Sequence, residues 1–174
     1  MAPKRKRPRH KQVEDAKPPQ FAPFSPRVSD YDRILCDTGI LLALADRKQR
    51  DHQLVRALLQ SRLKQTATLK LLTTWPCFTE TMYLAQRHGG WPLQSQVAQL
   101  IYQDIIEIRC PVVDEENYDR LFALMEQYQN VPMDLADATL VLMAEATGLR
   151  EILTLDSDFQ IYRVHQHETF EILP

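Results

Sequence analysis

Hydrophobic and polar positions follow two different spacings along residues 33–173. Short apolar runs predict four β-strands and a fifth at the sheet edge, over residues 33–37, 66–75, 105–113, 151–155 and 169–173. Apolar residues at helical spacing predict six helices, over residues 38–46, 51–63, 76–88, 92–104, 114–129 and 133–147. Strands that alternate with helices indicate an α/β fold of three layers, α/β/α, around a mainly parallel central sheet of four or five strands.

Residues 1–30 differ from the rest of the chain in composition. They hold six of the eleven prolines and few aliphatic side chains, so they cannot bury enough apolar surface to offset the entropy of ordering. We expect a disordered leader over 1–30 and one folded domain over 31–174. The leader has eight Lys or Arg against three acids (+5), and the remainder has 13 against 20 (−7). A basic tail on an acidic body favours a nucleic-acid partner, or simply a solvated leader.

The whole chain has the composition of a soluble globular protein, with 44% hydrophobic and 25% charged residues. No apolar run approaches the roughly 20 residues that cross a bilayer. No apolar segment of a secretory signal follows the basic start. We therefore expect a cytoplasmic protein without membrane contact. Cys36, Cys77 and Cys110 are odd in number and widely spaced, which favours reduced, mostly buried thiols over disulfides or a zinc site.

Six acids occur where a parallel sheet would gather them: Asp37, Glu80, Asp134, Asp137, Asp156 and Asp158. Asp37 ends the first strand, and Asp156 follows the fourth. Asp134 and Asp137 are three residues apart at a helix start, so they share a face. Because the carboxyl ends of parallel strands meet at one edge of the sheet, we expect the acids along that edge.

Carboxylates in one cleft repel each other and raise one another's pKa. A hard divalent cation such as Mg²⁺ or Mn²⁺ takes oxygen ligands and removes that penalty. Such a site suits the hydrolysis of phosphodiesters, since the metal lowers the pKa of a bound water and neutralises developing charge. A simpler explanation stays open for each acid alone. Asp134 could cap its helix, Asp137 could favour the helix dipole, and Asp37 and Asp156 could cap the segments that follow them.

Four segments resemble, in order, the motifs of the PIN-domain family, specifically the VapC-type ribonuclease toxins of prokaryotic toxin–antitoxin pairs. They are Ile34-Leu35-Cys36-Asp37-Thr38-Gly39, Pro76-Cys77-Phe78-Thr79-Glu80, Asp134-Leu135-Ala136-Asp137-Ala138 and Leu153-Thr154-Leu155-Asp156-Ser157-Asp158-Phe159. The resemblance covers residues 33–165. It implies a PIN-like fold and a Mg²⁺- or Mn²⁺-dependent endoribonuclease.

The resemblance assigns the catalytic and metal-binding roles to four acids: Asp37, Glu80, Asp137 and Asp156. Of these, Asp37 and Asp137 match the family's metal ligands best. Glu80 and Asp156 would complete the ligand set or hold waters on the metal. Residues of second rank are Asp134, Asp158, Thr38 and Thr154. The threonine hydroxyls would orient neighbouring carboxylates, and Asp158 could take the place of Asp156.

The resemblance also implies partners, namely an RNA substrate, an antitoxin protein that blocks the site, and a second copy in a homodimer. The leader departs from the family pattern, because such toxins begin almost at the first strand. It could be an added RNA-binding arm. A different class of function stays open, namely a PIN-fold scaffold that binds RNA or protein without cutting. The complete set of four acids favours the nuclease.

Other enzyme classes lack their residues. A phosphoacceptor receiver domain needs a Lys after its last strand, and no Lys follows Lys70. A haloacid-dehalogenase-type phosphatase carries Asp-x-Asp on its first strand, whereas Asp156-Ser157-Asp158 follows a late one. The chain contains no G-x-G-x-x-G, P-loop or G-x-S-x-G segment. Trp75 and Trp91 are expected in the core, not as platforms for stacked bases.

Overall fold

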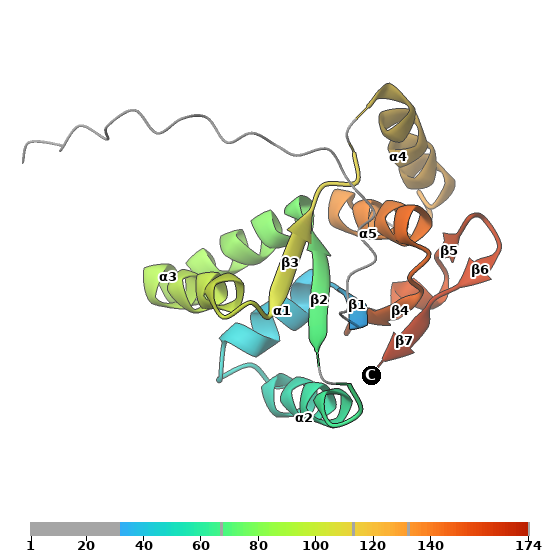
Figure 1. The fold of residues 1–174 in the computed structure, drawn as a ribbon. Helices are drawn as coiled ribbons and strands as arrows, with labels where there is room; N and C mark the ends of the chain where they lie inside the picture. The colour runs from blue at the N-terminus through green and yellow to red at the C-terminus, as the bar shows by residue number, and fades with distance from the viewer. Residues whose placement is uncertain (1–31, 67, 113, 132, 174) are drawn as a thin grey trace, which may run out of the picture.

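The computed structural model describes residues 32–66, 68–112, 114–131 and 133–173, so the predicted leader lies outside the described residues. The central sheet has five strands: β1 (Asp32–Cys36), β2 (Leu69–Thr74), β3 (Ile106–Arg109), β4 (Glu151–Leu153) and β7 (Glu171–Leu173). Their order is β3-β2-β1-β4-β7, and every neighbouring pair is parallel. The expected α/β fold and edge strand are confirmed (Figure 1). Because every neighbouring pair is parallel, the carboxyl ends of the strands belong to one edge of the twisted sheet.

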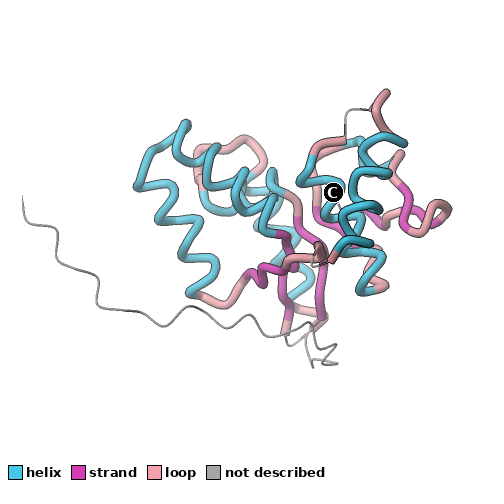
Figure 2. Tube along the Cα trace, turned by 90° about the horizontal axis from the view of Figure 1, so that it is seen from above, coloured by secondary structure: helices cyan, strands magenta, loops and turns pink. Residues whose placement is uncertain are grey.

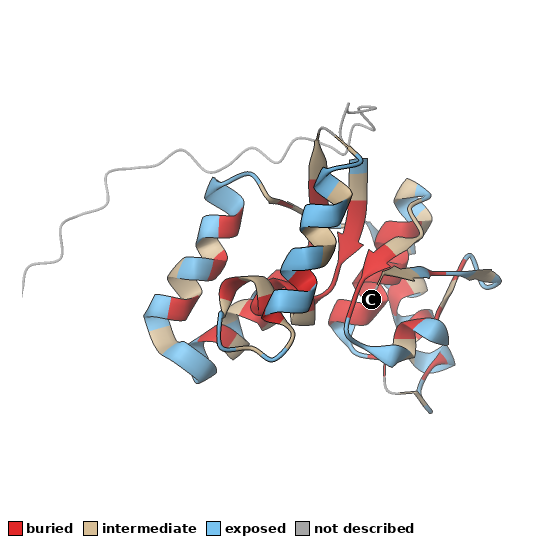
Figure 3. Ribbon diagram, turned by 90° about the horizontal axis from the view of Figure 1, so that it is seen from below, coloured by how far each residue is buried: buried red, intermediate tan, exposed pale blue. Residues whose placement is uncertain are grey.

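The described residues form five α-helices: α1 (Thr38–Ala45), α2 (His52–Leu63), α3 (Trp75–Tyr102), α4 (Glu115–Gln127) and α5 (Leu135–Thr147). Side chains alternate across each strand, so β1 sends Ile34 to one face and Leu35 to the other. Ile34 packs in the hydrophobic cluster of α1 and α3, whereas Leu35 packs in the cluster of α4 and α5. Figure 2 shows strands between two groups of helices, and Figure 3 shows burial along the strands and inner helix sides. The three layers are therefore present.

Helix α3 contains the break expected at Gly89-Gly90. Gly90 has φ 62° and ψ −157°, a conformation that favours glycine, and Pro92 follows at the start of the second half. The Gln94 side chain donates to the Met82 carbonyl at 3.1 Å, so the two halves lie side by side (Figure 1). The two predicted helices are thus the two limbs of one helical hairpin.

Several boundaries differ from the prediction, since capping and turns decide them. Strand β2 ends at Thr74, whose hydroxyl accepts from the Cys77 amide and starts α3. Strand β3 ends at Arg109, two residues before Pro111. A 3₁₀-helix, η1 (Ser157–Gln160), and a small antiparallel pair, β5 (Arg163–Val164) with β6 (Glu168–Thr169), were not predicted.

The prediction that both tryptophans lie in the core is wrong. Trp75 is 49% exposed and Trp91 is 71% exposed. Trp75 occupies the first position of α3, and Trp91 directly follows the Gly90 break at the end of the hairpin, where little of the chain covers it. Cys36 and Cys77 are buried free thiols, as expected, and Cys110 is exposed. Within the described residues, no helix combines the length and apolar character needed to cross a membrane.

Candidate functional site

Asp37 lies where β1 ends and is held from three sides. Its amide donates to the Leu153 carbonyl at 3.1 Å, which joins the ends of β1 and β4. Oδ1 accepts from the Thr38 amide at 2.5 Å and so caps α1, while Oδ2 accepts from the Thr154 hydroxyl at 3.0 Å. The residue is only 8% exposed. The carboxylate is thus fixed at the edge of the sheet, and Thr154 makes the contact expected of it.

Glu80 lies in α3 and reaches the start of α1. The Thr38 hydroxyl is 2.9 Å from Glu80 Oε2 and 3.2 Å from the Cys77 carbonyl oxygen, two acceptors for one proton. Thr38 is itself buried. This contact brings Glu80 next to Asp37, although the two residues belong to different βα connections.

Asp134 and Asp137 both lie in the start of α5. Asp134 Oδ1 accepts from the Asp137 amide at 2.9 Å and caps the helix, so the capping explanation is confirmed for it. Asp137 is 9% exposed, and its Oδ2 accepts from the Tyr162 hydroxyl at 3.2 Å. The Thr74–Thr139 hydroxyl contact of 2.8 Å ties α5 to the start of α3. The start of α5 is therefore anchored beside the end of β2.

Asp156 and Asp158 follow β4 in one turn. The Asp156 amide donates to the Thr154 hydroxyl oxygen at 2.9 Å, and its Oδ1 accepts from the Asp158 amide at 2.9 Å, which caps η1. The charge of Asp156 is among the largest causes that raise the pKa of both Asp37 and Asp137, whereas the charge of Asp158 contributes to the raised pKa of Tyr162. Asp156 is therefore the member of this pair that belongs to the acid group.

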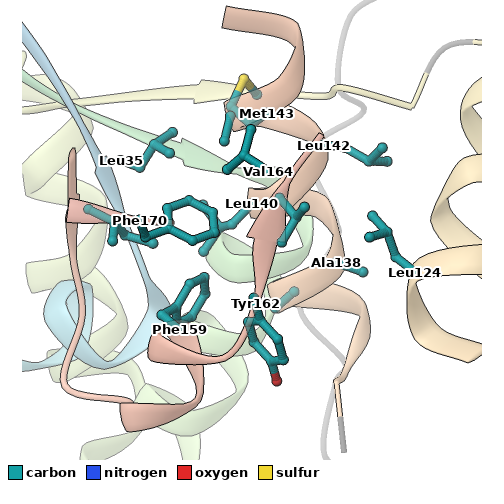
Figure 4. Packing of buried hydrophobic residues seen from close by; sticks show 14 of the residues in the cluster. Leu35, Leu124, Ala138, Leu140, Leu142, Met143, Phe159, Tyr162, Val164 and Phe170 are labelled. Atoms are coloured by element: carbon teal, nitrogen blue, oxygen red, sulfur yellow. The ribbon is translucent and has the colours of Figure 1, made fainter. Parts of the chain in front are cut away.

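Tyr162 is a site residue that the sequence motifs do not contain. Its side chain is fully buried and packs edge-on against Phe159 and Tyr128, with ring centroids 5.2 and 5.1 Å away. Figure 4 shows its ring inside the cluster and its hydroxyl oxygen pointing out of it, and this hydroxyl donates to Asp137. A single aromatic residue outside any motif gives no signal in the sequence for such a contact.

Burial and mutual repulsion raise the pKa of two acids of the site, Asp37 and Asp137. The pKa of Asp37 is raised from its ordinary value of 3.8 to about 6, mainly because the carboxyl group is buried. Hydrogen bonds from Thr154 and Thr38 lower this pKa, and the charges of Asp156 and Glu80 raise it. The pKa of Asp137 is raised to about 7, first by burial and then by the charges of Asp134 and Asp37. Burial and the charge of Asp137 hold the pKa of Tyr162 well above its usual range, so this hydroxyl stays a donor.

Five acids are thus close neighbours: Asp37, Glu80, Asp134, Asp137 and Asp156. In the described part of the chain, no Lys, Arg or His forms an ion pair with any of them. Three of these acids have one carboxylate oxygen that accepts no hydrogen bond from the described residues. These oxygens are Glu80 Oε1, Asp137 Oδ1 and Asp156 Oδ2. Free oxygens and uncompensated negative charge are what a hard divalent cation requires, so these residues fit Mg²⁺ or Mn²⁺ in type and charge.

The acids are not gathered round a single point. Within the ranges that the structure describes, no three His, Cys, Asp or Glu side chains are placed so that they could hold a metal ion together. Asp37 has both oxygens engaged by Thr38 and Thr154, although each oxygen keeps a further lone pair. Side chains of the group would therefore have to move to form a ligand set, and the exposed Asp156 and half-buried Glu80 are the least confined of them.

The model of the PIN domain family matches residues 34–164, and the chain belongs to this family. Among solved structures, the chain is similar to VapC20 of Mycobacterium tuberculosis, a sarcin-ricin loop cleaving toxin. The two share 17% identity over 74% of this chain and 93% of that one, with a TM-score of 0.63. It is also similar to a chain of VapBC2 from Rickettsia felis, whose structure was solved bound to a DNA fragment from the VapBC2 promoter. Here the identity is 12%, the match covers 82% of this chain and 100% of that one, and the TM-score is 0.55. No curated protein matches the chain. At these identities the similarity is one of fold.

Proposed function

We propose that this chain is a Mg²⁺- or Mn²⁺-dependent endoribonuclease that hydrolyses RNA phosphodiester bonds. The observation that carries the proposal is the group of acids at the carboxyl edge of the sheet, which raise one another's pKa without a cation partner among the described residues. Membership of the PIN domain family supports it. The similarity in fold to a toxin that cleaves the sarcin-ricin loop supports RNA as the substrate class.

Four acids would hold the cation: Asp37, Glu80, Asp137 and Asp156. When bound, the cation lowers the pKa of a water and neutralises charge that develops on the phosphoryl oxygens. The chain itself orients the acids, because Thr154 donates to Asp37 and Tyr162 donates to one oxygen of Asp137. Thr38 does the same for Glu80. Burial of Asp37 and Asp137 makes their charge costly without a cation, which favours uptake of one.

The remaining acids have secondary parts in this proposal. Asp134 fixes the start of α5 through its cap and adds negative charge beside Asp137. Asp158 shapes the turn after β4, since its amide binds Asp156 and its carbonyl accepts from the Tyr162 amide. Neither needs to touch the cation.

We further propose that the protein acts in the cytoplasm as the toxin of a toxin–antitoxin pair. The similarity in fold to VapC20 and to VapBC2 supports this role. The proposed partners are the RNA substrate, an antitoxin protein that blocks the site, and a second copy in a homodimer.

The test is an RNA cleavage assay on the purified full chain with Mg²⁺ or Mn²⁺, and with a chelator in place of the metal. We expect cleavage only with metal, and its loss in Asp37→Asn. Asp119→Asn, which neutralises an exposed acid of α4, is the matched control and should cleave like the wild type. Full activity in a folded Asp37→Asn variant would refute this use of the acids. A wild type that binds RNA without cutting it under any metal would identify a non-cleaving scaffold.

A further inference from the structure

Arg87 on α3 forms no ion pair with a carboxylate among the described residues. Its guanidinium donates to the Tyr83 hydroxyl at 2.9 Å and lies 5.7 Å from the centroid of the Tyr83 ring. Both side chains are exposed, Tyr83 by 57%. A guanidinium held against an aromatic ring keeps its remaining N–H donors for another acceptor. The other face of the ring stays open to a second planar group such as a base.

Other described arginines are engaged differently. Five of them form ion pairs with Glu side chains: Arg33, Arg62, Arg109, Arg120 and Arg150. Arg163 donates to three backbone carbonyls. In the described part of the chain, the exposed side chains of Arg47, Arg50 and Arg56 form no hydrogen bond and no ion pair. Arg87 therefore combines two properties, a contact with Tyr83 that sets the place of its guanidinium and a charge that no described carboxylate pairs with.

The position of Arg87 relates it to the acid group. It follows Glu80 by seven residues, nearly two full helical turns, so both residues lie on the same side of α3. Tyr83 lies one turn from Glu80 on the neighbouring strip. The rise between Glu80 and Arg87 is about 10 Å, and three stacked nucleotides of one strand span a similar length at roughly 3.4 Å each.

We propose that Tyr83 and Arg87 form a binding subsite for single-stranded RNA, in which Arg87 binds a backbone phosphate and Tyr83 stacks on a base. The proposal rests on the proposed function, because Glu80 must mark the place of cleavage for the distance to have meaning. An acidic site repels a polyanion, and a free cation a few nucleotides away offsets that repulsion. Stacking on an aromatic ring tolerates any base, so this subsite holds the strand without selecting sequence.

The test measures fluorescence anisotropy of a labelled single-stranded RNA with the full chain carrying Asp37→Asn, which prevents cutting. Arg87→Gln should raise Kd about tenfold, because a charge-assisted hydrogen bond is lost. It should also lower the salt slope of binding by about one unit. Arg56→Gln removes the same charge from α2 and is the control. Tyr83→Ala should raise Kd about fivefold or more without a change in salt slope, because a stacked base is lost. Tyr102→Ala removes another exposed tyrosine, 80% exposed, and is the control.

The outcomes separate this subsite from the nuclease itself. Weaker binding in Arg87→Gln and Tyr83→Ala, with controls and molecular mass in sedimentation unchanged, supports the subsite even if the wild type cuts no RNA. Cleavage by the wild type with unaltered RNA binding in Arg87→Gln overturns the subsite and leaves the nuclease intact. A changed mass in Arg87→Gln identifies the surface as a protein contact and also overturns it.

Discussion

The two ends of the central sheet treat charge in opposite ways. Toward the amino end, three acids form ion pairs with cations of the same chain. The pairs are Lys70 with Asp104, Arg33 with Glu107 and Arg62 with Glu151. At the carboxyl end, Asp37 and Asp137 are more deeply buried than any of those acids and form no ion pair with a Lys, Arg or His among the described residues. The charges of other carboxylates raise their pKa instead.

This difference separates charge that serves the fold from charge that serves a ligand. The amino-end pairs join neighbouring elements and are complete without anything from solution. The carboxyl-end acids raise one another's pKa, which is a cost that the chain could avoid with one well-placed lysine. We infer that this end is built to accept a cation from outside.

The largest effect should follow the removal of one buried charge at the carboxyl end. Asp137→Asn keeps the size of the side chain and an oxygen for Tyr162, but it removes a proposed metal ligand. Losing the partner of a ligand costs roughly 10–100-fold in metal affinity or activity, so losing a ligand should cost more than about 100-fold in cleavage rate. Glu107→Gln at the amino end is the control and should cleave at the wild-type rate. Equal losses in both variants would erase the difference between the ends.

A smaller effect should follow the loss of the Tyr162 hydroxyl. Tyr162→Phe leaves Asp137 without its donor, and we expect apparent Mn²⁺ affinity to fall by about tenfold. Tyr128→Phe is a close match, since it removes the hydroxyl that accepts from the Arg163 amide and touches no acid. Titration calorimetry measures the affinity. If both variants lose stability alike and neither loses Mn²⁺ affinity, Tyr162 has only a structural role.

The stability of the metal-free protein should fall as pH rises. Asp37 and Asp137 keep their protons in the folded state up to about pH 6 and about pH 7, whereas the unfolded groups lose theirs near 3.8. Between these values the folded state binds more protons, so each step upward in pH favours unfolding, and the loss is complete above about pH 7.

Each pKa unit corresponds to about 1.4 kcal/mol, so pKa values of about 6 and about 7 in place of 3.8 set an upper bound of about 7 kcal/mol on the total loss. We expect a smaller loss, because each charge raises the pKa of the other and the two contributions do not add. Urea unfolding with a chelator, at several pH values, measures it. The double variant Asp37→Asn with Asp137→Asn should flatten the curve, and Mn²⁺ should restore stability at the upper end of the range only. A curve that keeps its slope in the double variant would assign the pH dependence to other groups.

The smallest effect belongs to the amino end. Arg33→Gln breaks one half-buried ion pair, while Arg109 continues to hold Glu107. We expect a loss of less than about 1 kcal/mol in the free energy of unfolding, measured in urea, because partly solvated pairs contribute little. RNA cleavage and Mn²⁺ affinity should be unchanged. A fall in either would show that the amino end also serves the ligand.

The fold could be predicted from the sequence where burial alone decides. Strands covered on both faces must be continuously apolar, as residues 34–36 are, and the order of strands and helices follows from that. The ends of strands and helices could not be predicted from burial alone. Strand β2 ends at Thr74 because this residue caps α3, and the apolar pattern does not mark a cap. Trp91 was misplaced because the pattern counts an aromatic residue as core, while the turn at Gly90 carries it into solvent.

The candidate acids could be predicted because strand ends and helix starts fix their place in a parallel sheet. The capping and shared-site explanations turned out to be compatible. Asp37 and Asp156 each cap the following element with one oxygen and still belong to the acid group. Tyr162 could not be predicted, since its contact with Asp137 depends on the path of the chain through η1 and on packing against Tyr128.

The cation site at the carboxyl end is tested most directly by a Mn²⁺ titration of the full chain, monitored by electron paramagnetic resonance. We expect saturable Mn²⁺ binding in the wild type and in Glu107→Gln, and its loss in the folded double variant Asp37→Asn with Asp137→Asn. The expected loss has a physical reason, because these two acids are the buried charges without a cation in the described structure. Mn²⁺ binding that is absent from the wild type, or equally strong in the double variant, would contradict it.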